Sequence, residues 1–303
     1  MDDATLRRVE AELSALTSTG GELHRHSPLA TYRPGMLVSP DRIRFQRRLL
    51  DELIAEGEED VQKDGLAAVV TAGPPGAGKS TMVRNLHLGG PGWRVIDADA
   101  IKLRLLEAAV RDGIFGKILV RRLADGFFIM PNELSSLVHN ESVLLADRLI
   151  ERSLEARENV VIEGTMSWHG LPRQYAQMLE LHEYADVTIV DVEVDCATAL
   201  EQAYFRWSEG RTKAINGARN GGGRFTPREA ITSIYDASGF SVCNQNAVDF
   251  FNSPEVAGFS EMELIISTGP LPEDLQVYRR IVGEHTEEPP GYLKDSASVT
   301  KVN

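Results

Sequence analysis

The sequence predicts an α/β protein in which a mainly parallel sheet is flanked by helices on both faces. Three observations lead to this prediction. Apolar runs of strand length alternate with helical patterns, a glycine-rich loop joins the first such run to a helix start, and two helical patterns precede that loop. We divide the chain into a helical N-terminal extension at 1–63, an α/β domain at 64–284 and a tail at 285–303. The tail has few large apolar residues, and we expect it to be disordered.

The glycine-rich loop fits the pattern G-x-x-x-x-G-K-[ST], known as the P-loop. The loop consists of Gly73-Pro74-Pro75-Gly76-Ala77-Gly78-Lys79-Ser80-Thr81, and the apolar run 66–72 before it predicts a buried parallel strand. Glycines let successive backbone N–H groups turn toward one phosphate. We expect Lys79 to reach the β- and γ-phosphates and Ser80 to bind Mg²⁺. The sequence therefore predicts the P-loop NTPase and kinase fold, with bound ATP or GTP.

Composition narrows the possible partners. The net charge is −13, which argues against a nucleic-acid-binding surface. Cys196 and Cys243 lack a metal-type spacing and suggest a reducing compartment, so we expect a cytoplasmic protein. The sequence shows no signal peptide pattern and no apolar run near the ~20 residues of a membrane helix. We expect no membrane association.

The first 63 residues contain two amphipathic helical patterns. The first covers 1–19 and ends at Gly20-Gly21. The second begins at Ser39-Pro40, with Ser39 as cap, and is broken by the acidic stretch 56–60. His24 and His26, in the intervening loop, are expected to be surface histidines.

Two carboxylates follow the second predicted strand at 93–97. Asp97 and Asp99 stand at its C-terminal end, where open α/β sheets bind ligands. One of them can accept the proton of an acceptor hydroxyl, and the other can orient water or a metal ion. The alternative is that they are turn and helix-cap residues. We favour a functional role for Asp99.

Helical patterns cover much of 100–129 and a longer stretch after Pro131. His139 and Glu141 lie on the longer helix, where such a polar pair is more often a solvated helix face than a site. The third strand, 159–163, ends in Glu163-Gly164-Thr165, and Gly164 permits a close approach of the backbone to a ligand.

The C-terminal half continues the alternation. The fourth strand, 187–194, contains Asp191, which is a possible Walker-B acid although its spacing does not single it out. A helix at 197–209 precedes the glycine- and arginine-rich loop 216–224, which we interpret as a mobile lid over the triphosphate. We predict further helices from Thr226 and over 272–282, on either side of a last strand at 263–267.

Four segments in this order resemble the zeta toxin family of P-loop kinases. They are the P-loop, Val95-Ile96-Asp97-Ala98-Asp99, Val161-Ile162-Glu163-Gly164-Thr165 and Arg224-Phe225-Thr226-Pro227. The helix before the P-loop is also similar to that of many members. The resemblance covers roughly residues 39–270, most of the globular chain.

The resemblance implies phosphorylation of UDP-N-acetylglucosamine by ATP or GTP, and a small helical antitoxin as partner. Asp99 matches the proton-accepting residue of the family, and Lys79 and Ser80 match its phosphate and Mg²⁺ ligands. Arg206 and Arg224 match the two arginines that bind the triphosphate. Glu163, Thr165 and Glu141 match acceptor contacts of the family, and we also assign Asp97 and Lys102 to the acceptor side.

The sequence also departs from the family pattern on the acceptor side. Ser167 stands where prototypes carry an arginine, and Lys102-Leu103-Arg104-Leu105 replaces a His-Pro pair. More residues therefore support the kinase prediction than support the prediction of the acceptor. A dinucleotide or another nucleotide-like acceptor stays open.

Two other classes of nucleotide-binding protein have sequence signals that this chain lacks. A GTPase-type switch needs a guanine-reading Asn-Lys-x-Asp, which does not occur in the sequence. A mechanical or regulatory ATPase favours a strand ending in Asp-Glu, which is also absent. Steady ATP turnover without an acceptor would support these alternatives.

Overall fold

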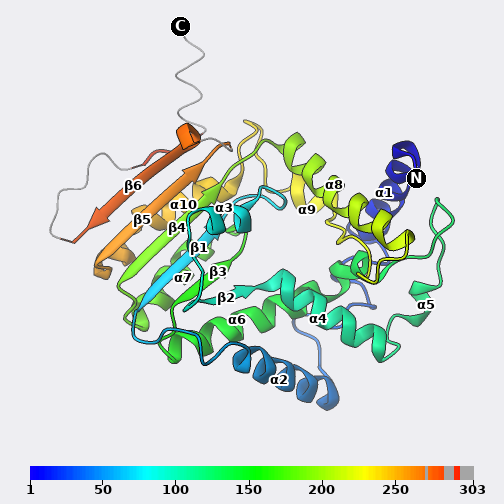
Figure 1. Cartoon of the computed structure of the whole chain (residues 1–303), viewed down its shortest axis with the longest axis horizontal. Helices are drawn as coiled ribbons and strands as arrows, with labels where there is room; N and C mark the ends of the chain where they lie inside the picture. Colours follow the sequence, from blue (N-terminus) through cyan, green and yellow to red (C-terminus); the bar gives the residue numbers. More distant parts are fainter. Residues whose placement is uncertain (270–271, 283–289, 294–303) are drawn as a thin grey trace, which may run out of the picture. The chain divides into compact units, whose positions relative to one another are not determined.

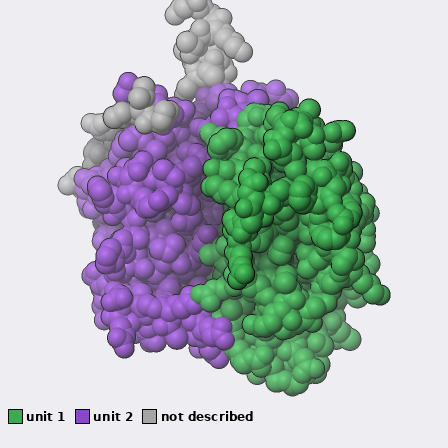
Figure 2. Space-filling view, turned by 45° about the vertical axis from the view of Figure 1, so that its right-hand side comes forward, with its two compact units in different colours: residues 1–49, 98–147, 200–232 green, residues 50–97, 148–199, 233–303 purple. Residues whose placement is uncertain are grey.

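The computed structural model describes residues 1–269, 272–282 and 290–293. The chain forms two compact units, each built from three separate stretches (Figure 2). Unit 1 comprises residues 1–49, 98–147 and 200–232, and unit 2 comprises 50–97, 148–199 and 233–303. These units differ from the three consecutive segments, 1–63, 64–284 and 285–303, into which we divided the chain from its sequence. That division into domains stays a prediction. The expected disordered tail, 285–303, lies outside the described residues except for 290–293.

Unit 2 contains one six-stranded sheet in the order β2-β3-β1-β4-β5-β6 (Figure 1). The first five strands are parallel, and β6 runs antiparallel to β5. The strands are β1 Ala67–Ala72, β2 Arg94–Asp97, β3 Val160–Glu163, β4 Asp186–Val192, β5 Glu261–Ser267 and β6 Leu275–Ile281. The five predicted strands and their common, mainly parallel sheet are confirmed.

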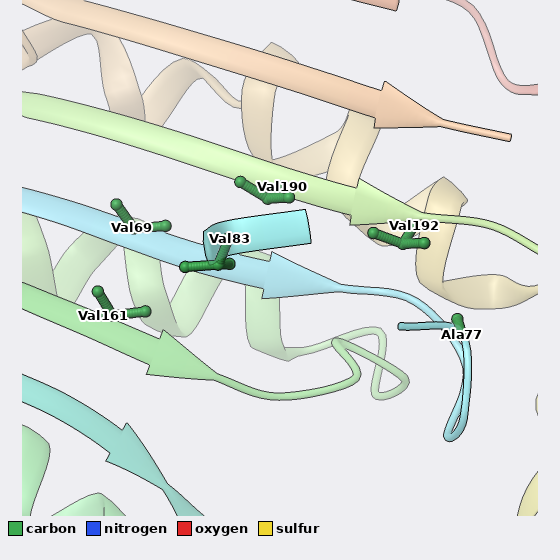
Figure 3. Packing of buried hydrophobic residues seen from close by; sticks show 6 residues of the cluster. All are labelled: Val69, Ala77, Val83, Val161, Val190 and Val192. Carbon is green, nitrogen blue, oxygen red and sulfur yellow. The ribbon is translucent and has the colours of Figure 1, made fainter. Parts of the chain in front are cut away.

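Helices cover both faces of this sheet. On one face, Val69, Val161 and Val190 pack against Val83 of α3 (Lys79–Asn85) (Figure 3). Because successive strand residues point to opposite faces, Asp191 lies on the other face, where it contacts α10 (Val242–Asn252). The remaining helices of this unit are α7 Leu171–Leu181, η2 Pro254–Gly258 and η3 Pro272–Asp274.

One element of the predicted fold is wrong. We predicted a helix over 272–282, but only a short 3₁₀ turn forms there before β6 begins. Leu275, Val277 and Tyr278 suit a strand, and the whole segment pairs with β5 from Ser267↔Leu275 to Glu261↔Ile281. Pairing with an open sheet edge outweighed a weak helical pattern.

Unit 1 is helical. Its elements are α1 Asp3–Thr17, α4 Ala98–Arg111, α5 Gly116–Leu119, η1 Pro131–Val138 and α9 Arg228–Thr232. Three helices have residues in both units, namely α2 Pro40–Ala55, α6 His139–Glu155 and α8 Cys196–Ile215. Ser39 caps α2 as predicted, since its hydroxyl accepts a hydrogen bond from the Arg42 N–H at 3.2 Å. None of the helices in the described ranges is long and apolar enough for a membrane span.

Candidate functional site

The P-loop of unit 2 is shaped by glycine at two critical points. Gly73 has φ +125°, and a Cβ there would lie 2.1 Å from the Val192 carbonyl oxygen on the neighbouring strand. Gly78 has φ +96° immediately before α3. Neither position suits an L side chain, so the loop needs the glycines that the motif requires. The predicted strand–loop–helix arrangement is present.

Lys79 lies over its own loop. Its ammonium group donates hydrogen bonds to the Gly73 oxygen at 2.9 Å and to the Pro74 oxygen at 2.8 Å. The side chain is therefore held over the loop that binds phosphate in proteins with this motif.

The hydroxyl of Ser80 and the carboxylate of Glu163 are in contact at the P-loop. The Ser80 hydroxyl donates to Oε2 of Glu163 at 2.6 Å, because β3, which ends at Glu163, is the strand next to β1. A hydroxyl and a carboxylate are ligands that suit Mg²⁺, which takes few protein ligands and keeps waters and phosphate oxygens. Within the described ranges, no group of three or more His, Cys, Asp or Glu side chains is placed to hold a metal ion. The pair fits a Mg²⁺ ion whose remaining ligands are waters and phosphate oxygens.

The segment after β3 is hydrogen-bonded to the P-loop strand. The Thr165 oxygen accepts a bond from the Gly73 N–H at 3.1 Å, and the Thr71 hydroxyl bonds both backbone groups of Gly164. The Thr165 hydroxyl donates to that of Ser167 at 2.9 Å. Two predicted acceptor-side residues, Glu163 and Thr165, are thus brought to the P-loop.

The proposed Walker-B acid Asp191 belongs to a buried carboxyl pair. Its Oδ2 accepts a bond from Asn244 at 2.8 Å, and the Glu193 carboxylate accepts one from Ser241 at 2.6 Å. Burial raises the pKa of both groups. A protonated Glu193 can donate to Asp191, whose Oδ1 has no other hydrogen-bond partner among the described residues. Ser80 contacts Glu163, so the acid at the P-loop hydroxyl is Glu163 and not Asp191.

Asp99 lies in unit 1, in the first turn of α4, whereas Asp97 ends β2 in unit 2. Lys102 donates to one Asp99 oxygen at 2.8 Å, and Arg224 contacts the other at 2.7 Å. Burial alone would raise the pKa of Asp99, but Lys102, Arg224 and Arg206 outweigh it and hold that pKa at about 2. Asp99 is therefore an ionised hydrogen-bond acceptor at any ordinary pH.

The predicted solvated face of α6 is wrong. Glu141 is fully buried, and its carboxylate accepts bonds from Arg42 at 2.7 Å and from Gln46 at 2.8 Å. Burial, with help from nearby Lys102 and Arg25, lowers the pKa of His139 to about 3, so this imidazole is neutral. The bonds to Glu141 do not test its predicted role as an acceptor contact.

The loop before Arg224 is anchored to η1. The side-chain amide of Asn132 donates to the oxygens of Asn220 and Gly222, each at 2.9 Å, and Ser135 donates to the Phe225 oxygen at 2.8 Å. These bonds anchor residues 220–225 to η1, and the mobile lid that we predicted over 216–224 stays a prediction.

A buried ion network supports α8 beside that turn. Arg211, which is fully buried, bonds Asp125 through Nε at 2.8 Å and Glu133 through Nη1 at 2.7 Å. Trp207 also donates to Glu133, and its ring packs edge-on against Phe225. The network thus steadies the helix that carries Arg206 and the turn that carries Arg224.

Several residues that support the site were not predicted from the sequence. Asn132, Arg42, Asn244 and Glu193 each hold a predicted residue or its neighbour. Only Glu193 carried a usable signal, because it stands two residues after Asp191 and shares its face of the strand.

Comparison with known proteins agrees with a nucleotide-binding P-loop domain. A family model described as an AAA domain matches residues 69–215. One similar solved structure comes from the PezAT chromosomal toxin–antitoxin system of the human pathogen Streptococcus pneumoniae. It is 16% identical, covers 77% of this chain and 78% of that chain, and has a TM-score of 0.42.

A second similar structure is the AvrRxo1-ORF1 and -ORF2 complex. It is 17% identical, covers 82% of this chain and 71% of that chain, and has a TM-score of 0.48. No curated protein matches the sequence. The sheet topology and the matched AAA domain confirm the predicted fold class, a mainly parallel sheet flanked by helices around a P-loop.

Proposed function

We propose that this protein is an ATP- or GTP-dependent kinase that transfers the γ-phosphate to a hydroxyl of a nucleotide-like acceptor. The observation that carries the proposal is Asp99, a carboxylate held between Lys102 and Arg224 in a chain with a complete P-loop. A nucleotide-dependent switch or regulatory ATPase needs no such acceptor-binding carboxylate, which favours the kinase over these alternatives.

The donor side uses the P-loop. Lys79 leaves its carbonyl partners for the β- and γ-phosphates, and backbone N–H groups of residues 73–81 bind the phosphate oxygens. Ser80 and Glu163 are the residues that would hold a Mg²⁺ ion, which would neutralise charge on the phosphates. Asp97, at the end of β2 and in register with Glu163, would orient a water molecule at such an ion.

The acceptor side uses Asp99. Its carboxylate accepts a hydrogen bond from the acceptor hydroxyl and takes the proton as the new bond to phosphorus forms. With a pKa of about 2, Asp99 is a weak base, and this suits phosphoryl transfer, where the transition state is loose and positioning dominates. Arg206 and Arg224 offset the charge of the transferred group.

We propose UDP-N-acetylglucosamine as the acceptor, from the resemblance to zeta toxins, with a dinucleotide as the alternative. Thr165 and Lys102 are the candidate contacts besides Asp99. Glu141 and Glu163 are retained as candidates, although each already bonds a neighbouring side chain.

The test is a screen of nucleotide sugars and dinucleotides for phosphate transfer from labelled ATP, read by product mass. We expect one acceptor to gain a single phosphate with the parent protein and far less with Asp99→Asn. ATP hydrolysis at the same rate with and without every acceptor would contradict the kinase and favour the regulatory ATPase.

We further propose a toxin acting in the cytoplasm, restrained by a small helical antitoxin. Overproduction of the active protein in bacteria should slow growth, and Lys79→Ala produced to the same level should not. Harmless overproduction of protein with verified kinase activity would contradict the toxin role.

A further inference from the structure

Trp168 differs from the other tryptophans of the chain. It lies between β3 and α7 in unit 2 and is 62% exposed, whereas Trp207 is 1% exposed. A large aromatic ring left in water forgoes the stabilisation that burial would provide. This ring also sits in the segment that follows the carboxyl end of β3, where open α/β sheets bind ligands.

The segment that carries Trp168 is hydrogen-bonded at both ends. Upstream, the Thr165 oxygen accepts the Gly73 N–H of the P-loop at 3.1 Å. Around Trp168, the fully buried Asn246 of α10 donates to the Met166 oxygen at 2.7 Å and bonds Nδ1 of His169 at 3.0 Å. Trp168 is therefore presented from a fixed segment joined to the P-loop.

The backbone is strained in order to hold this position. Met166 has φ +53°, a left-handed conformation that costs energy for a residue other than glycine. At Gly170, an added Cβ would lie 2.3 Å from two ring atoms of Trp168, so the indole rests against bare backbone. One part of the ring is seated on Gly170 while most of it stays exposed.

We propose that Trp168 is a stacking platform for a nucleobase. This proposal rests on the proposed function, since it assigns a subsite of the same nucleotide-using centre. A flat, exposed indole on a segment hydrogen-bonded to Gly73 of the P-loop is suited to the face of a planar base, and stacking discriminates little between bases. The donor and the nucleotide-like acceptor both carry such a base, so the ring can belong to either.

The experiment measures binding without turnover, by calorimetry on the full chain. The probes are ATP, UDP-N-acetylglucosamine and inorganic tripolyphosphate, which lacks a base. The variants are Trp168→Ala, Trp168→Phe and the control Phe127→Ala, which removes another exposed aromatic ring in unit 1. Because Trp168 is exposed, we expect all variants to fold, and circular dichroism checks this.

We expect Trp168→Ala to weaken one of the two nucleotides by about fivefold to a hundredfold, with Trp168→Phe between this and the parent. Tripolyphosphate binding and the Phe127→Ala variant should be unchanged. A loss confined to ATP assigns the donor base, and a loss confined to UDP-N-acetylglucosamine assigns the acceptor base.

Two outcomes overturn the platform. Equal nucleotide affinities for the parent and Trp168→Ala show that the ring binds no base, even if the protein is a kinase. Equal losses for ATP and tripolyphosphate show that the substitution disturbed the P-loop instead. The proposed kinase activity fails separately, if the parent binds nucleotides but phosphorylates no acceptor in the screen.

Discussion

The P-loop of unit 2 and the Asp99 cluster of unit 1 are built in different ways. The P-loop is one contiguous stretch, and its shape depends on glycine conformations and on Val192 of the adjacent strand. In the Asp99 cluster, Asp99 pairs with Lys102 on the same helix and with Arg224, which is far away in the sequence.

Because of this difference, we expect substitutions in the two regions to have different effects. A backbone-built loop tolerates changes elsewhere but depends on its own few residues. A cluster of charges depends on the buried networks behind it, such as Arg211 with Asp125 and Glu133. Substitutions in the loop should therefore affect chemistry without stability, and substitutions in the networks should affect stability first.

The largest effect is expected for Lys79→Ala. Losing the ammonium group removes its charge from the β- and γ-phosphates, so phosphate transfer should be abolished while the fold is kept. The measurement is transfer by product mass beside the melting temperature. The matched control is Lys63→Ala, an exposed lysine of the same unit, which should transfer normally. A folded Lys79→Ala protein with near-normal transfer would falsify the role of the loop.

Asp99→Asn should lower the rate of phosphate transfer by about 10²–10⁴-fold, because asparagine cannot accept the proton of the acceptor hydroxyl. Nucleotide affinity should be unchanged, because the two side chains have nearly the same size. The paired variant Asp97→Asn should be less affected. If Asp97→Asn loses transfer and Asp99→Asn does not, the two carboxylates are assigned the wrong way round.

The pH profile sharpens this prediction. Since the Asp99 pKa is about 2, its ionisation should produce no loss of activity between pH 5 and 8 in the parent. Lys102→Ala removes a cation and should raise that pKa, which moves any acid-side loss of rate toward higher pH. An acid-side loss that stays in place would show that another group controls it.

Arg211→Ala tests whether the buried ion network of unit 1 stabilises the fold. It leaves Asp125 and Glu133 buried without their cation, and we expect a loss of about 3–5 kcal/mol in the free energy of unfolding. The control is Lys213→Ala, two residues along the same helix, which breaks an exposed pair with Glu209 and should cause no measurable change. Equal denaturation midpoints for the two variants would refute the role of the network.

The smallest effect is expected at the buried carboxyl pair of unit 2. Burial raises the Glu193 pKa above the ordinary 4.5, so above that pH the unfolded chain loses a proton that the folded chain keeps. Stability should therefore fall as pH rises, by at most about 1.4 kcal/mol per pH unit for one proton.

Glu193→Gln removes this titration and should flatten the pH dependence of the melting temperature between pH 5 and 9. Glu183→Gln, an exposed residue of the same unit, serves as control and should keep the slope of the parent. An unchanged slope in Glu193→Gln would mean that Glu193 is already ionised in the folded protein.

By itself, the sequence determined the P-loop, the five parallel strands and the placement of Asp97 and Glu163 at strand ends. These features depend on local patterns: apolar runs of strand length, glycines at fixed spacing and polar residues directly after a strand. Such patterns can be recognised in a single sequence because each of them involves only a few neighbouring residues.

Only the tertiary structure decided the rest. It paired Ser80 with Glu163, buried Glu141 against Arg42, anchored the Arg224 turn through Asn132 and turned the predicted helix at 272–282 into β6. Apart from β6, which pairs with the strand directly before it, each of these features depends on a partner distant in sequence. A charged residue on a helix has the same local pattern whether water or a buried arginine faces it, and burial alone makes the difference.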